Sequence, residues 1–179
     1  MKMHKIIYIP ARVGSKGIPQ KNIRPFLDKP LIFNVIEIAL KMKEFNVYVD
    51  TDSEELILII KKHFRNKVFF YKRNKNYAGD AITIDQSIYK FLFDMNFNNG
   101  DVITIQPTSP LLKYETLINS YKEFISIKTE TLITVNERKK LSWKKSKNKF
   151  KPIYKKRLNR DNLEPIYEEN GALIISKIQ

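Results

Sequence analysis

Short apolar runs alternate along the chain with longer stretches in which apolar residues recur every three or four positions. The short runs predict strands at Lys5–Ile9, Asn46–Asp50, Val68–Tyr71, Val102–Ile105 and Leu132–Val135. The longer stretches predict helices at Leu31–Met42, Ser53–Phe64, Thr83–Phe93 and Thr116–Ile127. This alternation indicates an α/β fold, in which right-handed crossovers build a mostly parallel sheet with helices on both faces.

The pattern breaks after Val135. Residues 136–166 are basic and poor in aliphatic runs, and a run of Lys, Ser and Asn at 145–149 is typical of a turn. The segment therefore predicts a β-hairpin. The apolar pattern resumes at Ala172–Ser176. We expect a single domain over residues 1–179 with an inserted lobe at about residues 136–166.

The composition is that of a folded protein. Hydrophobic residues make up 42% of the 179 positions, which argues against disorder. No apolar run approaches the ~20 residues of a membrane-spanning helix, and no signal peptide is apparent at the N-terminus. Because the chain has no cysteine, disulfides and thiolate chemistry are excluded. These features predict a cytoplasmic protein without a membrane partner.

The formal net charge of +14 points to an anionic partner or to a biased composition. The densest cluster of Lys and Arg runs from Arg138 to Arg157, and a solvated surface is the favoured interpretation there. No segment is typical of a recognition helix or a base-stacking platform. We therefore favour a small anionic ligand over a nucleic acid.

In a parallel α/β sheet, ligands bind beyond the carboxyl ends of the strands. The loops to consider begin at Pro10, Thr51, Lys72 and Gln106. In the first loop, Gly14 and Gly17 allow backbone N–H groups to approach an anion. Three cationic side chains of the same loop can neutralise phosphate charge: Arg12, Lys16 and Lys21. A polyphosphate site is favoured, and a basic strand-to-helix turn is the alternative.

Five segments of the chain carry a family resemblance. They are PARVGSKGIPQKN at 10–22 followed by PLI at 30–32, TDSEE at 51–55, Arg73 with YAGD at 77–80, QPTSPL at 106–111, and Arg160 with ENGA at 169–172. In this order they resemble the acylneuraminate cytidylyltransferases, or CMP–N-acetylneuraminic acid synthetases, including relatives that act on legionaminic and pseudaminic acids.

The resemblance implies a Rossmann-like, three-layer α/β/α nucleotidyltransferase fold. It implies in-line transfer of CMP from CTP to the anomeric hydroxyl of a nine-carbon 2-keto sugar acid, with release of pyrophosphate and help from Mg²⁺. It also implies a homodimer in which the inserted lobe packs against a second subunit. Gly17 looks more like the sialic and legionaminic acid branches than the pseudaminic one.

The resemblance assigns catalytic charge stabilisation to Arg12, Lys16 and Lys21. The nucleotide would be bound by Ala11, Arg12, Gly14, Ser15, Lys16, Gly17, Lys21, Asn22, Arg73, Asp80 and Thr83. The sugar acid would be bound by Gln106, Pro107, Thr108, Ser109, Arg160, Asn170 and Gly171.

Several of these residues also have structural interpretations. Asn22 can cap the following turn, Asp80 and Thr83 can cap the predicted helix, and Arg73 can hydrogen-bond a backbone group. Asp52, next to the site, can orient the basic loop or act as an N-cap. Two more alternatives concern the sugar site: a proline-stiffened turn at 106–110, and a positive φ at Gly171.

The chain departs from the family pattern at three places. Asp161 follows Arg160 where the family has an amide, and Ile174 stands where it often has an aromatic residue. The family's C-terminal Asp-x-Asp element, which binds the metal, is absent from these 179 residues. A fragment, another metal arrangement and a binding protein without turnover are the three explanations. The metal ligands are therefore left unassigned.

Overall fold

The computed structural model describes residues 3–14, 17–74, 77, 79 and 81–178. The chain divides into two compact units. The first comprises Met1–Ile133 with Gly171–Gln179, and the second comprises Thr134–Asn170.

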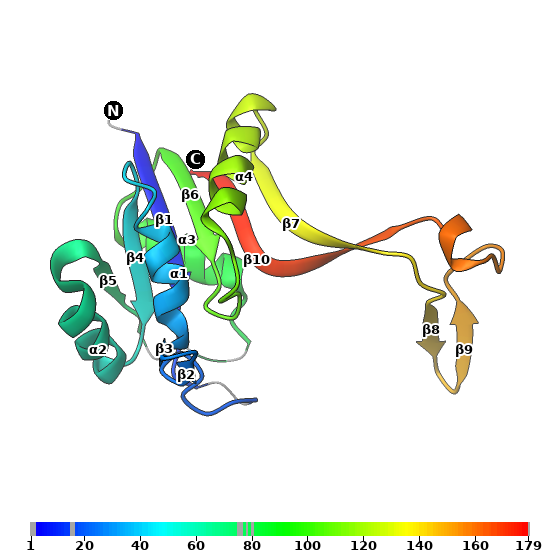
Figure 1. Cartoon of the computed structure of the whole chain (residues 1–179), viewed down its shortest axis with the longest axis horizontal. Helices are drawn as coiled ribbons and strands as arrows, with labels where there is room; N and C mark the ends of the chain where they lie inside the picture. The colour runs from blue at the N-terminus through cyan, green and yellow to red at the C-terminus, as the bar shows by residue number, and fades with distance from the viewer. Residues whose placement is uncertain (1–2, 15–16, 75–76, 78, 80, 179) are drawn as a thin grey trace. The chain divides into compact units, whose positions relative to one another are not determined.

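A six-stranded sheet forms the centre of the first unit, in the order β5-β4-β1-β6-β10-β7 (Figure 1). Its strands are β1 (His4–Pro10), β4 (Asn46–Thr51), β5 (Phe69–Lys72), β6 (Gly100–Ile105), β7 (Thr131–Arg138) and β10 (Ile166–Ile178). β1 pairs in parallel with β4 and β6, and β4 pairs in parallel with β5. The predicted parallel sheet is confirmed for these four strands.

The C-terminal strand alters the expected order of the sheet. β10 runs antiparallel to β6 and separates it from β7, the strand predicted at Leu132–Val135. Leu173 and Ile175 of β10 are fully buried, whereas Ile133 and Val135 of β7 are exposed. β10 therefore supplies the apolar side chains next to β6, and β7 takes the edge of the sheet.

In the described part of the chain, four α-helices connect the strands: α1 (Leu31–Ala39), α2 (Glu54–Phe64), α3 (Ile84–Asp94) and α4 (Tyr114–Ser126). Two-residue strands β2 (Pro25–Phe26) and β3 (Lys29–Pro30) precede α1, and a short 3-10 helix (Arg65–Lys67) follows α2. Among the described residues no helix is long and apolar enough to cross a bilayer. Even α4 has 13 residues where about 20 are needed.

Helices cover both faces of the sheet, because apolar side chains of β1 alternate between the faces. Ile7 and Ile9 pack in a buried cluster with residues of α1, α2 and α4. Ile6 and Tyr8 point to the other face and pack with Phe91 of α3. The three-layer α/β/α arrangement predicted from the sequence is confirmed.

Helix ends follow local sequence signals where a side chain can cap them. The Ser53 hydroxyl accepts the Leu56 N–H at 3.1 Å, and Thr83 forms a capping box with Gln86. The prediction for α1 was too long, since the helix ends at Ala39. Met42 is still buried, but it reaches the core from a turn in which its N–H bonds to the Ala39 carbonyl.

The second unit contains the predicted hairpin, formed by β8 (Trp143–Ser146) and β9 (Lys149–Pro152). Ser146 pairs with Lys149, so the turn is the two residues between them, and the first of these has φ +51°. A short 3-10 helix follows (Arg160–Asn162). The predicted lobe at residues 136–166 falls inside this unit. The role of the lobe in dimerisation stays a prediction.

Gly100 is a position where the sheet requires glycine. Its φ is +138°, and an added Cβ would lie 1.9 Å from the backbone oxygen of His4, its partner on β1. We expect Gly100→Ala to lower the free energy of unfolding by about 3 kcal/mol or more, from strain and displacement of β1. Urea unfolding measures this change.

Gly14→Ala is the matched control, because an added Cβ there meets no atom within 4 Å. Its free energy of unfolding should stay within about 0.5 kcal/mol of the unsubstituted protein. Equal effects of the two substitutions would contradict the assignment.

Candidate active site

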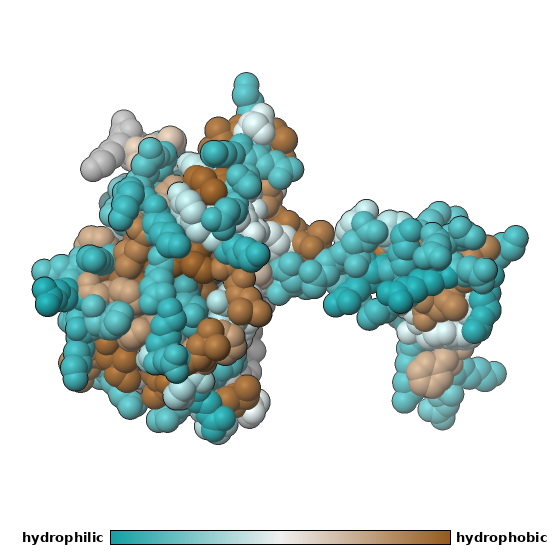
Figure 2. All heavy atoms as spheres, in the orientation of Figure 1, coloured by the Kyte–Doolittle hydropathy of each residue, from teal (hydrophilic) through white to brown (hydrophobic). Residues whose placement is uncertain are grey.

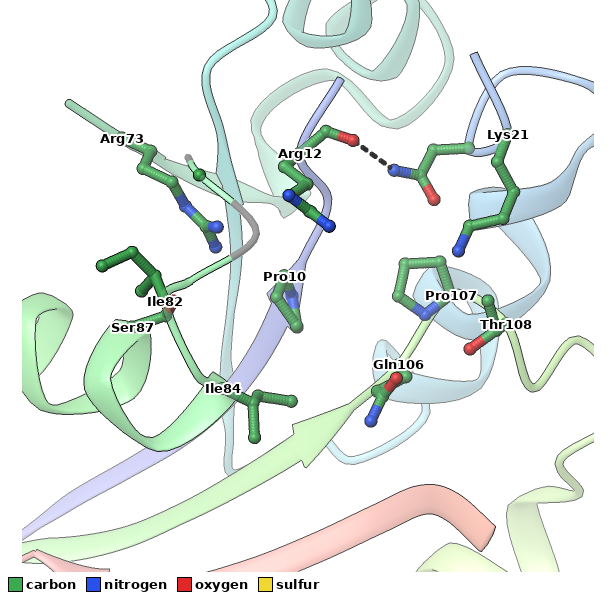
Figure 3. Close-up of a pocket in the computed structure, with 12 residues that line it drawn as sticks. Pro10, Arg12, Lys21, Arg73, Ile82, Ile84, Ser87, Gln106, Pro107 and Thr108 are labelled. Atoms are coloured by element: carbon green, nitrogen blue, oxygen red, sulfur yellow. Dashed lines mark hydrogen bonds between the residues drawn. The ribbon is translucent and has the colours of Figure 1, made fainter. Parts of the chain in front are cut away.

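Loops from the carboxyl ends of three parallel strands meet the start of α3 around a cavity of about 250 Å³ (Figure 3). Its lining comes from the first unit alone: Pro10, Arg12, Lys21, Asn22, Arg73, Gly79, Ile82, Ile84, Ser87, Gln106, Pro107 and Thr108. Three of the four loops singled out from the sequence line this cavity, those that begin at Pro10, Lys72 and Gln106.

Backbone and side-chain hydrogen bonds hold the first loop on the end of β4. The Ala11 N–H bonds to the Asp50 carbonyl at 2.8 Å, and Ala11 is buried. The Val13 N–H bonds to Asp52 Oδ1 at 2.9 Å. Of the two roles predicted for Asp52, orientation of the basic loop is therefore the observed one, while Ser53 caps α2.

Asn22 closes the same loop. It is buried, and its Nδ2 donates to the Arg12 carbonyl at 3.2 Å (Figure 3). The backbone carbonyl of Asn22 accepts a hydrogen bond from the N–H of Ile32 in α1 at 3.1 Å. Asn22 therefore lines the cavity and also ties the strand-to-helix loop together, although its side chain bonds back to Arg12 instead of capping the following turn.

The two glycines of this loop are not explained by packing. Neither Gly14 nor Gly17 has a positive φ, and an added Cβ at either would meet no atom within 4 Å. Both are exposed. The backbone is therefore open at both glycines, and their contact with an anion stays a prediction.

Arg12 and Lys21 bring positive charge to the cavity. Their charged ends point toward the same space in Figure 3. The described residues place no carboxylate within 4 Å of the Lys21 amine, so this cation is available to an anionic ligand. Of the predicted phosphate ligands, Ser15 and Lys16 lie outside the described residues.

Arg73 is held in a buried network beside the cavity. Its Nε donates to Asp50 Oδ1 and Oδ2 at 2.9 and 3.0 Å, and its Nη2 donates to Oδ2. The Tyr8 hydroxyl donates to Asp50 Oδ2 and accepts from Arg73 Nη2 at 3.4 Å. The side-chain partner of Arg73 is thus a carboxylate, whereas the sequence suggested a backbone group or the nucleobase.

The network is close to neutral, because the Asp50 carboxylate offsets the guanidinium charge of Arg73. Burial raises the pKa of Tyr8, and the neighbouring Asp50 charge raises it further. Burial alone would lower the pKa of Arg73, but its hydrogen bonds to Asp50 and the carboxylate charge raise it instead. Arg73 therefore stays charged, and Tyr8 stays neutral, across the ordinary pH range.

The wall formed by α3 was largely missed from the sequence. Ile82 and Ile84 flank the helix cap Thr83, and Ser87 follows one turn later with its Oγ donating to the Thr83 carbonyl at 3.1 Å. Thr83 itself caps α3, which is its structural interpretation. The cap was a usable signal, because it fixes where α3 starts. Asp80 lies outside the described residues.

The loop after β6 forms the opposite wall. Gln106, Pro107 and Thr108 line the cavity, and the Ser109 N–H closes a turn onto the Gln106 carbonyl at 3.1 Å. Gly171 has φ +66°, and an added Cβ would lie 3.0 Å from Gln106 Nε2. The positive φ expected for Gly171 is confirmed, and its lack of a side chain leaves room for Gln106.

Two residues of the predicted sugar site belong to the second unit. Asn170 accepts a hydrogen bond from Thr134 Oγ1 at 2.7 Å and donates to Asn136 Oδ1 at 3.4 Å. Arg160 begins the short 3-10 helix, where the Leu163 N–H bonds to its carbonyl. Their binding role stays a prediction.

The described residues do not form a metal centre. No group of three His, Asp or Glu side chains among them is placed to hold an ion, and no carboxylate belongs to the described cavity lining. Asp50 is engaged by Arg73, and Asp52 by the Val13 N–H. The described donor set therefore does not fit a resident Mg²⁺ ion.

Comparison with known proteins gives one family and several relatives. A family model described as "Cytidylyltransferase" matches residues 6–170. Pseudaminic acid cytidylyltransferase from Campylobacter jejuni is 35% identical over 75% of this chain. N-acylneuraminate cytidylyltransferase from Streptococcus agalactiae is 30% identical over 97% of it. The chain spans 59% and 43% of the lengths of these two relatives.

Solved structures support the fold. A CMP:2-keto-3-deoxy-manno-octonic acid synthetase complexed with CTP is similar over 97% of this chain and 74% of its own, with a TM-score of 0.65. Its sequence identity is 15%, so this similarity concerns the fold alone.

Alkaline pH tests the buried Tyr8 hydroxyl. The unfolded chain releases this proton near the ordinary tyrosine pKa of about 10, whereas the folded chain retains it. Stability is therefore complete below about pH 10 and falls above it, by about 1.4 kcal/mol per pH unit for this group. In urea unfolding, the stability of Tyr8→Phe should fall less steeply above about pH 10, by up to that amount per pH unit. Identical slopes would contradict the burial of a protonated Tyr8.

Proposed function

The chain belongs to the cytidylyltransferase family, and on this premise we propose that it transfers CMP from CTP to the anomeric hydroxyl of a nine-carbon 2-keto sugar acid. One observation carries the proposal. A single cavity combines the cations Arg12 and Lys21 with the polar loop at Gln106–Thr108, so a polyphosphate and a polyhydroxylated acid can be held side by side.

In the proposed reaction, the anomeric oxygen attacks the α-phosphorus of CTP in line, and pyrophosphate leaves with the electron pair of the broken P–O bond. The hydroxyl proton passes to solvent. Arg12 and Lys21 bind the triphosphate and stabilise the charge that builds up on the departing pyrophosphate. The open backbone at Gly14 and Gly17 adds N–H donors to the same phosphates.

The sugar acid is proposed to lie against Gln106 and Thr108, whose amide and hydroxyl groups suit its hydroxyls. The names of two relatives, a pseudaminic and an N-acylneuraminate cytidylyltransferase, support a nine-carbon acid. Gly17 favours the sialic or legionaminic acid type within that class. Arg160 and Asn170 are proposed to contribute further contacts to the sugar acid.

Mg²⁺ is proposed to arrive with CTP as part of the substrate. A cytoplasmic location is proposed because the chain has no cysteine.

Turnover tests this function directly. With CTP, Mg²⁺ and N-acetylneuraminic or legionaminic acid, the protein should release pyrophosphate in proportion to the CMP-sugar formed. Lys21→Ala should reduce kcat/KM by about a hundredfold, because a cation is lost from the developing charge. Lys62→Ala, an exposed lysine of α2, is the matched control and should leave the rate unchanged.

Two results would replace the proposal. Tight CTP binding without pyrophosphate release would indicate a nucleotide-binding relative that does not turn over. Binding to DNA or RNA that weakens steeply with salt, without CTP binding, would indicate a nucleic-acid-binding module.

A homodimer is proposed through the second unit. Large apolar side chains there are exposed, including Phe150 at 65%, Ile153 at 61% and Tyr167 at 60%. Apolar surface also appears between hydrophilic residues on the visible face of this unit (Figure 2). Exposed apolar groups gathered in one small unit are typical of a protein interface.

Sedimentation equilibrium tests the dimer. The unsubstituted protein should have twice the monomer mass at micromolar concentration, and Ile153→Asp should shift it toward the monomer because a charge is buried at the interface. Leu58→Asp, at an equally exposed leucine of α2, is the control and should not change the mass. A monomeric unsubstituted protein would rule the dimer out.

A further inference from the structure

Of the three residues in the Asp50–Arg73–Tyr8 network, only Arg73 is among those assigned to binding or catalysis. Asp50 and Tyr8 have no measurable exposure, and Arg73 is 7% exposed. A buried ion pair is a weak source of stability, because desolvation of both charges offsets their attraction. A buried charged network at the wall of a ligand cavity is more often a feature of the site.

Strand register places these three residues together. Pro10 lies opposite Asp50 between β1 and β4, and Asp50 lies opposite Tyr71 between β4 and β5. The Arg73 N–H continues the ladder to the Thr51 carbonyl at 3.0 Å. The backbone before the Arg73 side chain is therefore fixed by the sheet, and the guanidinium is fixed by Asp50.

The hydrogen bonds leave the guanidinium little freedom. Arg73 Nε is shared between both Asp50 oxygens, Nη2 bonds to Oδ2, and the Tyr8 hydroxyl bonds to that same oxygen. The Tyr8 ring is itself held against Phe91 of α3, with ring centroids 4.9 Å apart. A planar fork held on two sides is a preorganised donor, and no side-chain ordering is required when a ligand binds.

Charge divides the cavity into two ends. In Figure 3, Lys21 and Thr108 lie on one side of the cavity and Arg73 on the other, with Arg12 between them, and Lys21 has no carboxylate nearby among the described residues. At the Arg73 end, Asp50 offsets the charge, and the remaining wall is formed by Ile82, Ile84 and Ser87. A neutral, partly apolar end suits an uncharged planar group, whereas a polyphosphate is attracted to the other end.

We propose that Asp50 and Tyr8 are positioning residues, which act through Arg73 to hold a fixed, charge-compensated donor against the nucleobase end of the bound nucleotide. This inference rests on the proposed function, since it takes the nucleotide to be the ligand of the cavity. Neither residue touches the nucleotide. Their effect is on the affinity for the base and not on the affinity for the phosphates.

Two probes separate the two ends of the cavity: CTP occupies both, and inorganic triphosphate occupies the cationic end alone. Calorimetric titration of the 179-residue chain measures each affinity. Tyr8→Phe removes one hydroxyl and keeps the ring, and Asp50→Asn removes the charge at nearly constant shape. Tyr48→Phe is the matched control, because Tyr48 lies opposite Tyr8 on β4 and its hydroxyl is outside the network.

We expect Tyr8→Phe to weaken CTP binding about fivefold and Asp50→Asn about tenfold or more, since hydrogen bonds to charged groups are lost. Triphosphate should bind Tyr8→Phe within about twofold of the unsubstituted protein and bind Asp50→Asn equally or more tightly, because a negative charge is removed. Tyr48→Phe should bind both probes normally. A role in folding alone would weaken both probes together.

Three results are decisive. Loss of CTP affinity with triphosphate affinity retained supports the positioning role. Unchanged CTP affinity in both variants, or parallel loss of both probes, overturns it. Absence of CTP binding by the unsubstituted protein instead overturns the proposed function, so the two failures are distinguishable.

Discussion

Parallel pairing brings the carboxyl ends of β1, β4, β5 and β6 to the same edge of the sheet, and the cavity is lined by loops that leave this edge. The pairing needs β1 at the centre, where Ile6 to Ile9 are buried between helices on both faces. Residues that are distant in the sequence, such as Arg12, Arg73 and Gln106, become neighbours for this reason alone.

The same geometry explains why a charged network can be buried here. Parallel strands offer backbone partners for every N–H and carbonyl, so the polar groups left to satisfy are side chains. Asp50 accepts from Arg73 and Tyr8, and the described residues contain no buried polar side-chain atom without a partner. The network is thus compatible with the core and also gives the cavity an end that carries little net charge.

Charge is distributed unevenly between the two units. Lys and Arg are concentrated between Arg138 and Arg157 in the second unit, whereas the cations of the cavity come from the first loop. The overall charge of +14 therefore says little about the ligand. The position of two cations beside two open glycines is more informative, because local fields act over a Debye length of roughly 8–10 Å.

The sequence by itself determined the strands β1, β4, β5, β6 and β7, the helices α1 to α4, the hairpin, and three of the loops that line the cavity. Apolar periodicity and glycine-rich turns are local signals, and they depend on backbone geometry that neighbouring residues share. Capping was also readable at Ser53 and Thr83. The family motifs pointed to Arg12, Lys21 and Gln106 for the same reason, since each motif is contiguous in the sequence.

Only the tertiary structure decided which side chains meet. The insertion of β10 beside β6, the placement of Ile82, Ile84 and Ser87 on the cavity wall, and the capture of Arg73 by Asp50 and Tyr8 all involve residues far apart in the chain. In the sequence, Asp50 is one carboxylate at the end of an apolar run, and Tyr8 is one aromatic in another. Their pairing depends on strand register and burial, which no local pattern encodes.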